Sequence, residues 1–290
     1  MKVRFIFNPH SGSNRRNPHL HERAVAFIAE HKLDGSVVAT RRPRHATELA
    51  AQAVAEGCTL VVAIGGDGTM NEVATALVGT PAAFGLIPCG SGNGLGRHLG
   101  IHQAGHGAFR TLLEGRPRAV DTGVVNGFAF FNSMGLGFEA DIAVRFSRQT
   151  NRGLAGYFRV GVPAFFSHRP ETITVRHPGG TVELQTFTLA VMNSDQYGNN
   201  ARIAPGALMH DGRFDLISVP KVGLLGAGEM LYRLGTDSFE HVKAVTRLAG
   251  AEFVIERGQP GWIHTDGEPR ATTARLEISL KPESLRIMVP

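Results

Sequence analysis

An apolar run that breaks into glycines around one aspartate is the stretch of this sequence best suited to binding phosphate. Residues 60–64 are apolar throughout, as in a strand buried on both faces, and Gly65-Gly66-Asp67-Gly68 follows them directly. Because glycine has no Cβ, the backbone N–H groups of such a loop can approach a bulky anion. Thr69 and Glu72 have the spacing of a capping box, so we expect a helix to begin at Thr69 and direct its positive end at the loop. The same residues also fit an ordinary tight turn before a capped helix.

A second glycine-rich segment lies one predicted strand further along the chain. The apolar residues 83–87 are followed by Gly90-Ser91-Gly92-Asn93, and a turn-forming cluster over 8–13 follows a first apolar strand at 3–7. Loops that leave the carboxyl ends of neighbouring parallel strands meet at one edge of the sheet. Three such loops at one edge favour phosphate binding over unrelated turns.

Two acidic corners occur later in the chain. Asp211 precedes Gly212, and Asp266 precedes Gly267 and Glu268. Asp-Gly is a frequent hairpin corner, so each alone would be ordinary turn chemistry. Phosphoryl transfer requires hard oxygen ligands for Mg²⁺ and a carboxylate that positions or deprotonates the attacking hydroxyl. Beside a phosphate site, these corners could supply both.

The elements predicted to hold these residues change in kind near residue 118. Before it, strands alternate with helices, which is the pattern of a parallel sheet. The strands are predicted at 3–7, 36–40, 60–64 and 83–87, and the helices at 18–31, 46–56, 70–78 and 104–114. The first part of the chain is therefore predicted to be an α/β domain.

The second part of the sequence is mainly β, and it opens with a hairpin signal at Asn126-Gly127. Strands are predicted at 119–125, 128–133, 172–176, 181–192, 214–219, 251–256, 262–265 and 276–280, and helices at 139–147, 157–166 and 224–249. This pattern suggests a sandwich or a barrel. Phe158, Val162, Phe165 and Phe166 recur at helical spacing, which favours core packing and leaves an apolar cavity as the alternative.

Composition limits the class of protein. The 290 residues include 30 Lys and Arg against 25 Asp and Glu, which gives a net charge of +5. This excess favours acidic partners such as nucleotide phosphates or anionic lipid surfaces, and no nucleic-acid motif is present. Cys58 and Cys89 adjoin predicted buried strands, so we expect reduced thiols in a cytoplasmic protein. We also expect no membrane-spanning segment, because no long uncharged apolar stretch occurs.

Together these motifs resemble the diacylglycerol kinase catalytic-domain family, which includes sphingosine and ceramide kinases and the bacterial lipid kinases. The resemblance covers nearly the whole chain, in family order, through the segments 8–12, 65–72, 90–93, 211–214 and 266–268. It implies a Rossmann-like, NAD kinase-like domain made of residues 1–118 and 284–290, to which a final strand at 285–289 returns. It also implies a C-terminal β-sandwich domain, residues 119–283, which closes the cleft and contributes the lipid acceptor site.

The resemblance implies roles for individual residues as well. The residues implied for ATP are Asn8, Pro9, His10, Ser11, Gly12, Thr40, Gly66, Asp67, Gly68, Thr69, Met70, Asn71, Glu72 and Ser91. We expect Glu268 to be the general base and Asp67 to bind Mg²⁺-ATP, and the reverse assignment stays open. A structural Mg²⁺ is implied at Asp211 with the backbone oxygens of Leu208 and Arg213.

Candidate acceptor contacts are Asn93 and Asp141. The segment that contains Asp141 is similar to the sphingosine-kinase segment whose aspartate contacts the polar head of the long-chain base. The alternative for Asp141 is a solvated residue in the first turn of a helix, where the helix dipole stabilises its charge.

The family resemblance implies an ATP- and Mg²⁺-dependent lipid kinase that transfers the γ-phosphoryl group to a hydroxyl of a lipid such as diacylglycerol. The protein would be cytoplasmic and peripheral to the membrane, with no nucleic-acid partner, and a homodimer is left open. Sphingoid bases or ceramide are alternative acceptors, because the segment 91–97 is closer to the sphingosine-kinase form. A cofactor kinase like NAD kinase would leave the glycine loop at 90–93 unexplained. The presence of every expected acidic residue argues against a non-catalytic lipid or nucleotide binder.

Overall fold

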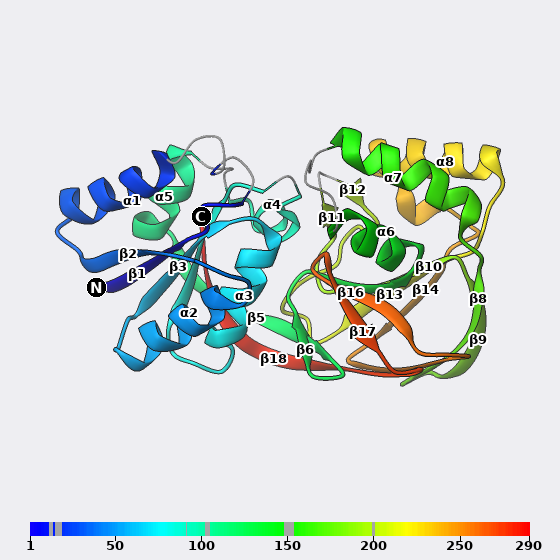
Figure 1. The fold of residues 1–290 in the computed structure, drawn as a ribbon. Coiled ribbons are helices and arrows are strands. Elements are labelled where there is room, and N and C mark those ends of the chain that lie inside the picture. The colour runs from blue at the N-terminus through cyan, green and yellow to red at the C-terminus, as the bar shows by residue number, and fades with distance from the viewer. Residues whose placement is uncertain (12–13, 15–18, 91, 102–104, 148–153, 199–200) are drawn as a thin grey trace. The chain divides into compact units, whose positions relative to one another are not determined.

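The chain folds into two units in the computed structural model, which describes residues 1–11, 14, 19–90, 92–101, 105–147, 154–198 and 201–290. Unit 1 contains Met1–Val120 and Glu283–Pro290, and unit 2 contains Asp121–Pro282. The chain passes from unit 1 to unit 2 along strand β5 (Arg116–Val125) and returns along the 15-residue strand β18 (Arg275–Val289), as Figure 1 shows.

Unit 1 is a parallel sheet with helices on both faces. Its strands β1 (Lys2–Phe7), β2 (Asp34–Ala39), β3 (Leu60–Gly65) and β4 (Ala83–Pro88) lie in the order β2-β1-β3-β4, and the end of β18 pairs in parallel with β4. Every residue of β3 is buried, as its continuous apolar sequence requires. The strand order reverses between β1 and β3, and such a switch point is where sheets of this kind bind ligands.

The helices of unit 1 are α1 (His19–Glu30), α2 (His45–Ala55), α3 (Asp67–Leu77), α4 (Gly94–His98) and α5 (His106–Glu114). On one face of the sheet, the Phe5 ring of β1 packs against Phe27 of α1 and Phe109 of α5. Helices α2 and α3 cover the other face (Figure 1). The predicted α/β character of this part of the chain is confirmed.

Unit 2 is a β-sandwich of two antiparallel sheets. One sheet has the order β14-β13-β10-β7-β16-β17, and the other contains β18, β15, β8 and β9, with β5 pairing both β18 and β6. The bounds are β6 (Phe128–Phe130), β7 (Ser133–Gly137), β8 (Glu171–His177), β9 (Gly180–Thr186), β10 (Thr188–Met192), β13 (Phe214–Val219), β14 (Thr246–Gly250), β15 (Glu252–Arg257), β16 (Gly261–Thr265) and β17 (Glu268–Thr272). Leu136, Val191 and Phe214 from the first sheet share one buried core with Val175 and Phe253 from the second.

Helices of unit 2 lie outside this core. They are α6 (Phe138–Ser147), α7 (Leu154–Ser167), α8 (Leu224–Gly235) and a 3₁₀ helix (Phe239–His241), and a short hairpin joins β11 (Gln196–Gly198) to β12 (Ala201–Arg202). Helix α8 contacts the outer face of the first sheet through Met230 and Leu234. In the described parts of the chain, none of the helices is long and apolar enough to cross a bilayer.

The hairpin predicted at Asn126-Gly127 is confirmed. Both residues have positive φ angles, 46° and 85°, and Val125 pairs with Phe128 across the turn. Asparagine and glycine are the residues that adopt this two-residue turn at the lowest cost, so the sequence signal was specific.

Two longer predictions in unit 2 are wrong in part. The helix predicted over 224–249 ends at Gly235, and Asp237 then adopts a φ of 53°, so that residues 246–250 form strand β14. The strand predicted over 181–192 is divided into β9 and β10 at Phe187, whose ring stacks on Phe138 at 4.8 Å. In the first case the segment Gly235-Thr236-Asp237-Ser238 itself ends the helix, and in the second the ring contact of Phe187 accompanies the break between the strands.

Candidate active site

The loops after β1 and β3 are joined at the carboxyl edge of the sheet in unit 1. The N–H group of Gly66 donates to Ser11 Oγ at 2.6 Å, and Asn8 Nδ2 donates to Thr69 Oγ1 at 2.8 Å. The backbone of Asn8 is fixed in turn, because its N–H donates to the Ile64 carbonyl at 3.0 Å. The structure therefore brings these four predicted nucleotide residues together at the switch point of the sheet.

Glycine is required at Gly66 and Gly90 because two backbone segments touch there. A Cβ on Gly66 would lie 3.1 Å from the Cα of Gly90, and a Cβ on Gly90 would lie 2.7 Å from the Cα of Gly66. Neither residue has a positive φ, so the requirement is space rather than backbone conformation. The two glycine loops are thus in contact, at the edge of the sheet where the sequence analysis expected both of them.

Asp67 ties the second glycine loop to the start of α3. Its Oδ2 accepts the N–H of Asn93 at 2.9 Å, and its Oδ1 accepts the N–H of Gly94 at 3.1 Å. The buried side chain of Asn93 exchanges two hydrogen bonds with the backbone of Gly90, at 2.9 and 2.7 Å. The amide of Asn93, a predicted acceptor contact, therefore holds the shape of its own loop.

Helix α3 begins at Asp67, two residues before the predicted start. Gly66 is its N-cap residue and, as a glycine, supplies no side-chain cap. The carboxylate of Glu72 instead accepts the N–H groups of Arg44 and Ala46, both at 3.0 Å, where α2 begins. The capping-box prediction is wrong, because Glu72 caps the neighbouring helix. Helix α3 therefore receives no cap from its own N-cap residue, and it directs the positive end of its dipole at the glycine loops, as helices do where they bind phosphate.

Other predicted nucleotide residues lie inside α3 or on the loops beside it. Met70 and Asn71 are buried within the helix, and Gly68 is in its first turn. Thr40 follows β2 and is buried, and its N–H donates to the Phe7 carbonyl at 2.9 Å. Pro9 and the exposed His10 are in the loop after β1, and Gly12 and Ser91 lie outside the described residues.

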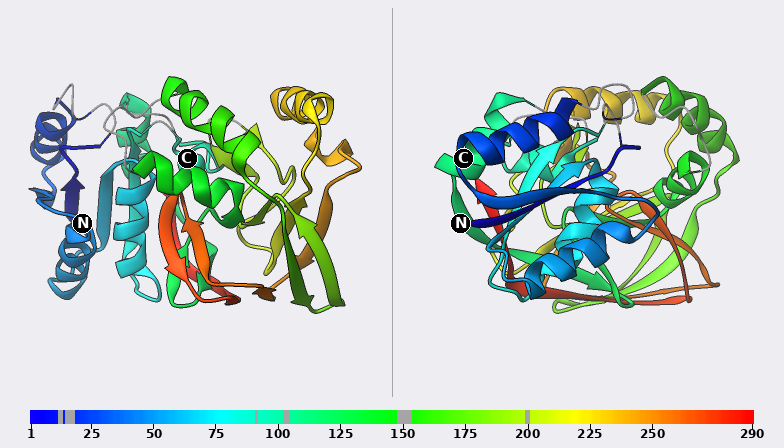
Figure 2. Two further views of the ribbon diagram at one scale, coloured as in Figure 1. Left: turned by 45° about the vertical axis from the view of Figure 1, so that its right-hand side comes forward. Right: turned by 60° about the vertical axis from the view of Figure 1, so that its left-hand side comes forward.

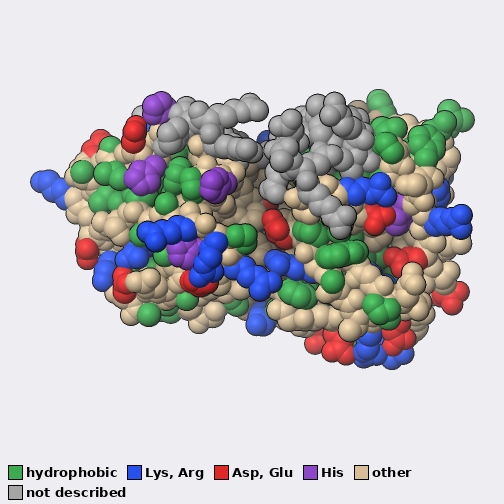
Figure 3. All heavy atoms as spheres, in the orientation of Figure 1, with side chains coloured by type: hydrophobic (Ala, Val, Ile, Leu, Met, Phe, Trp, Pro, Cys, Tyr) green, Lys and Arg blue, Asp and Glu red, His purple; other side chains and the backbone are tan. Residues whose placement is uncertain are grey.

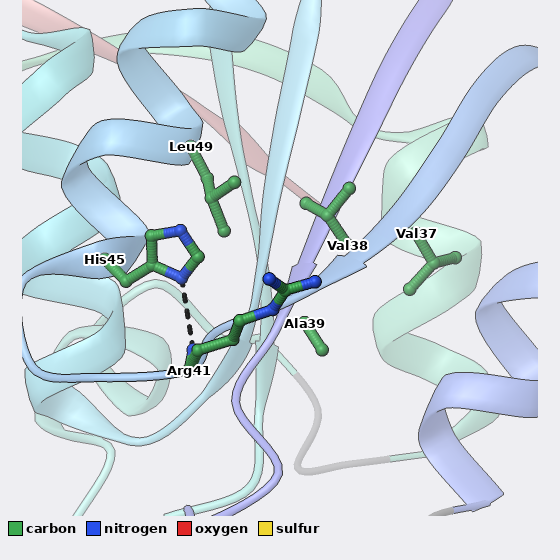
Figure 4. A pocket seen from close by; sticks show the side chains of 6 residues that line it. All are labelled: Val37, Val38, Ala39, Arg41, His45 and Leu49. Carbon is green, nitrogen blue, oxygen red and sulfur yellow. Dashed lines mark hydrogen bonds between the residues drawn. The ribbon is translucent and has the colours of Figure 1, made fainter.

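A hollow of about 440 Å³ lies next to Thr40, between the end of β2 and the start of α2 (Figure 4). Its lining side chains are Val37, Val38, Ala39, Arg41, His45 and Leu49. The N–H of Arg41 donates to His45 Nδ1 at 3.1 Å. Arg41, Arg42 and Arg44 are exposed here, and basic side chains gather on this face of unit 1 (Figure 3). The hollow offers an apolar wall and a cation beside a predicted nucleotide residue.

The buried Cys89 follows β4 directly. Burial raises the pKa of its thiol to about 11, and hydrogen bonds with Ser11 and Asn14 oppose the shift. Cys58 and Cys89 are both free and buried, as predicted. Because so little thiolate forms near neutral pH, Cys89 is unsuited to nucleophilic chemistry.

In unit 2, the carboxylate of Asp211 forms an ion pair with Arg213, two residues further along the chain. Arg213 Nε donates to Asp211 Oδ2 at 2.9 Å, and the Arg213 N–H donates to Oδ1 at 3.3 Å. The loop is fixed by Asp121, whose Oδ2 accepts the N–H of Gly212 at 2.9 Å. The pKa of Asp215 is raised above its ordinary value. Burial is the largest cause, the guanidinium of Arg213 opposes the shift, and the charge of Asp211 adds to it.

The oxygen atoms at this corner are ligands of the kind that a hard cation binds. The Asp211 carboxylate and backbone oxygens such as those of Leu208 and Arg213 are ligands of the type that Mg²⁺ takes. Arg213 is the competing cation, so a metal ion would have to replace its ion pair with Asp211. Within the described ranges, no group of three His, Cys, Asp or Glu side chains has an arrangement that could hold a metal ion.

Glu268 is the first residue of β17 and follows a two-residue turn. Asp266 and Gly267 have φ angles of 49° and 84°, and Thr265 pairs with Glu268 across the turn. Asp-Gly is one of the sequences that favour this geometry. The predicted base is therefore placed by a hairpin rather than by a flexible loop.

Asp266 anchors the turn to a distant segment of unit 2. Its carboxylate accepts the N–H groups of Phe131, Asn132 and Ser133, at 3.0, 2.8 and 3.0 Å. Its own N–H donates to the Ser133 carbonyl at 2.8 Å. The sequence identified this aspartate only as part of a motif, and the structure shows that it fixes the backbone just before Glu268.

The carboxylate of Asp141, a predicted acceptor contact in α6, is 2.8 Å from His168 Nδ1 through its Oδ2. The side chain is part-exposed, so some of the carboxylate remains accessible to solvent. His168 follows α7, and this contact therefore holds the end of α7 to the start of α6.

Family models match both units of this chain. Residues 2–125 match the diacylglycerol kinase catalytic domain, and residues 132–289 match the YegS C-terminal NAD kinase beta sandwich-like domain. The chain belongs to the diacylglycerol kinase family. The predicted family is confirmed, and membership supports a kinase.

Individual relatives of this kinase agree. A protein of Bacillus subtilis (strain 168) named diacylglycerol kinase is 30% identical over 228 residues, which cover 77% of this chain and 75% of the relative. A protein of Pseudomonas fluorescens named "Probable lipid kinase YegS-like" is 31% identical over 84% of this chain and 82% of its own. The fold matches the crystal structure of a diacylglycerol kinase from Bacillus anthracis with a TM-score of 0.78 at 22% identity, over 100% of this chain and 97% of that one.

A buried pair of side chains in this kinase was not predicted from the sequence. His264 Nε2 lies 3.3 Å from Glu139 Oε2, and the two side chains are 7% and 8% exposed. The N–H of Gly267 donates to His264 Nδ1 at 3.3 Å, and Nε2 is the ring nitrogen on the side of Glu139. Burial raises the pKa of Glu139, and His264 opposes the shift. Gly135 makes room for the pair, because a Cβ there would collide with Glu139 Oε1.

Proposed function

We propose that the protein is an ATP- and Mg²⁺-dependent lipid kinase that transfers the γ-phosphoryl group to a hydroxyl of a lipid such as diacylglycerol. The observation that carries the proposal is the junction of the strand-end loops in unit 1. There Gly66 contacts Gly90, and α3 begins directly after Gly66, a glycine N-cap residue that has no side chain. Backbone N–H groups and a helix dipole directed at one place suit nucleotide phosphates. The names of the relatives support a lipid acceptor.

In unit 1, the nucleotide phosphates would lie against the first turn of α3, with Ser11 and Asn8 holding the neighbouring loop in place. Asp67 accepts two backbone N–H groups, and a carboxylate is a ligand of the kind that Mg²⁺ takes. When bound, Mg²⁺ would neutralise charge on the phosphates. The residues that would hold it are Asp67 at the nucleotide and Asp211, with the Leu208 and Arg213 backbone oxygens, at the corner in unit 2.

Glu268 would supply the base. As the lipid hydroxyl oxygen forms its bond to the γ-phosphorus and the bond to ADP breaks, the Glu268 carboxylate would take the hydroxyl proton. The hairpin and the three hydrogen bonds to Asp266 support this role, because a base must be held in one position to act.

A direct assay tests the proposal. The purified protein is incubated with labelled ATP, Mg²⁺ and, in turn, diacylglycerol, sphingosine, ceramide, phosphatidylglycerol and NAD. We expect labelled phosphatidic acid from diacylglycerol, and a labelled sphingoid or ceramide product would favour the alternative acceptors. Labelled NAD without any labelled lipid would refute a lipid kinase, and no product at all would favour a non-catalytic binder.

Variants assign the base. Glu268→Gln should lower kcat by about 100-fold or more with little change in KM for ATP, since general base catalysis contributes about that much. Asp67→Asn should raise KM for ATP and weaken the dependence on Mg²⁺. Glu252→Gln, an exposed carboxylate in β15, is the matched control and should behave as the wild type. If Glu268→Gln retains turnover while Asp67→Asn loses it at saturating ATP, the two roles are reversed.

A further inference from the structure

Helix α8 carries apolar side chains on its outer surface. The exposed side chains are Leu224, Leu225, Leu231 and Tyr232, at 70%, 93%, 66% and 70%. At about 100° per residue, these positions fall within an arc of about 120°. The side that packs on the sheet carries Met230 and Leu234 instead. A surface helix normally turns polar residues toward the solvent. Helix α8 instead has apolar side chains both on the side that faces the sheet and on the side that faces the solvent.

Helix α7 adds two exposed apolar side chains at the same end of unit 2. Val162 and Phe166, one helical turn apart, are 53% and 65% exposed, whereas Phe165 packs against Phe138 and Phe187. The prediction of core packing is therefore wrong for Val162 and Phe166. Both helices lie on one side of the sandwich in all three ribbon views (Figures 1 and 2), and hydrophobic side chains gather there in Figure 3.

A basic side chain joins the segment after α7 to the segment before α8. Lys221 Nζ donates to the His168 carbonyl at 2.7 Å, and Arg169 beside it is exposed. The segment 160–170 contains Arg169 and no acidic residue, and over 218–235 Lys221 and Arg233 outnumber Glu229, which accepts a hydrogen bond from Arg233 at 2.8 Å. We call the six exposed apolar side chains of α7 and α8, together with Arg169 and Lys221, the α7–α8 surface.

We propose that the α7–α8 surface docks on an anionic lipid bilayer. The proposal rests on the proposed function, because a diacylglycerol acceptor is dissolved in a membrane. An amphipathic helix with an apolar arc and basic neighbours lies in the bilayer interface, with its apolar side chains below the headgroups. The net charge of +5 and the local excess of basic residues complement a negative lipid surface.

A bilayer fits this surface better than a second copy of the chain does. In a symmetric dimer through the surface, the same patch meets itself, so Lys221 and Arg169 would be brought toward their own equivalents. Like charges brought together in this way oppose association. A bilayer also accepts apolar side chains from two separate helices without a matching groove.

Vesicle flotation without ATP tests the docking. The wild type should float with vesicles of phosphatidylcholine that contain about one third phosphatidylglycerol, and added salt should weaken binding. Leu224→Gln/Leu225→Gln should bind at least about tenfold more weakly, since two exposed leucines lose their transfer into the interface. Val25→Gln, an exposed apolar residue on α1, is the matched control and should bind as the wild type does.

Fluorescence gives a second readout that does not depend on loss of binding. Trp262 is the single tryptophan, so Leu225→Trp/Trp262→Phe places the only indole on the α7–α8 surface. Its emission should shift to the blue when vesicles are added. Absence of that shift, failure of the wild type to float, or unchanged flotation of the double glutamine variant would each overturn the proposal. So would a double variant that floats normally but changes oligomeric state in gel filtration, which would indicate a second copy.

The failure of the docking and of the proposed function can be told apart. A short-chain diacylglycerol that is soluble in water is offered with labelled ATP in the absence of vesicles. If this lipid is phosphorylated while the wild type does not float, the docking fails alone. If the wild type floats through the leucines but phosphorylates no lipid, the proposed function fails and the docking stands.

Discussion

Replacement of Asp266 by asparagine separates the charge of this side chain from its shape. The aspartate Oδ1 accepts the N–H groups of Asn132 and Ser133, and Oδ2 accepts that of Phe131. Asparagine tolerates the φ of 49° and retains one oxygen, but its NH₂ group would face the N–H of Phe131. Hydrogen bonds to charged groups contribute about 1.5–3 kcal/mol each, so we expect a loss of about 2 kcal/mol in the free energy of unfolding. Alanine removes both acceptor oxygens and with them all three hydrogen bonds, so we expect a loss of at least about 4.5 kcal/mol.

Urea unfolding followed by the fluorescence of Trp262 measures this effect. Trp262 lies in β16, the strand that leads into the turn, so its signal reports the unfolding of unit 2. Asp237→Asn is the matched control, because Asp237 also has a positive φ, 53°, and its carboxylate makes an exposed ion pair with Arg202. That variant should lose less than about 1 kcal/mol.

The same variants should affect turnover more than nucleotide binding. The turn fixes Glu268, whereas the predicted nucleotide residues are in unit 1, so kcat should fall while KM for ATP changes little. Wild-type urea midpoints for both Asp266 variants would refute the anchoring role. Equal losses for asparagine and alanine would show that the carboxylate charge, rather than the number of acceptors, sets the stability.

Three further predictions concern other buried groups. Burial raises the pKa of Glu139 in the folded state above its ordinary 4.5, so the wild type loses stability as the pH rises from 4.5 through the folded pKa and the buried carboxyl becomes charged. Glu139→Gln stays neutral, so its urea midpoint should rise relative to that of the wild type across this window. A difference between the two midpoints that does not change with pH would contradict the shift. With a pKa of about 11, Cys89 is about 0.1% thiolate at pH 8. Ellman's reagent should therefore detect no rapidly reacting thiol in the native protein and two after unfolding. A thiol that reacts rapidly in the native protein would show that one of the cysteines is accessible. Glu72→Ala should lower the free energy of unfolding by about 1 kcal/mol by uncapping α2, and thermal unfolding that matches the wild type would contradict that capping.

The strand-end loops could be predicted because their signals are local. The apolar run at 60–64 specifies a buried strand, which the structure confirms, and the glycines after it were expected to admit an anion. The contact between Gly66 and Gly90 was not predicted. The Asn126-Gly127 turn is local in the same sense. Glu72 shows the limit, since its spacing from Thr69 fits a cap for α3 while its true partners, Arg44 and Ala46, belong to a different helix.

The unpredicted parts of the candidate site depend on pairing between distant strands. His264 faces Gly135 because β16 pairs with β7, and only then does Glu139 in the following helix reach the histidine. Asp266 meets residues 131–133 for the same reason. No period or spacing in one segment encodes such a register, which the packing of the two sheets determines. Exposure of the α8 leucines was also hidden, because an apolar helical pattern is the same whether it faces a core or a membrane.

Strand β18 contains the part of unit 1 that the ribosome synthesises last. Leu285 and Ile287 are fully buried, and Arg286 and Ile287 pair with β4, yet the ribosome makes all of unit 2 between β4 and these residues. At about 5–20 residues per second, roughly 200 residues require about 10–40 s. During that time the β4 edge has no partner from β18, and such an edge can pair with other chains. The nascent protein would therefore depend on chaperones at a stage when its sandwich is still emerging, and slow codons within unit 2 would lengthen the exposure.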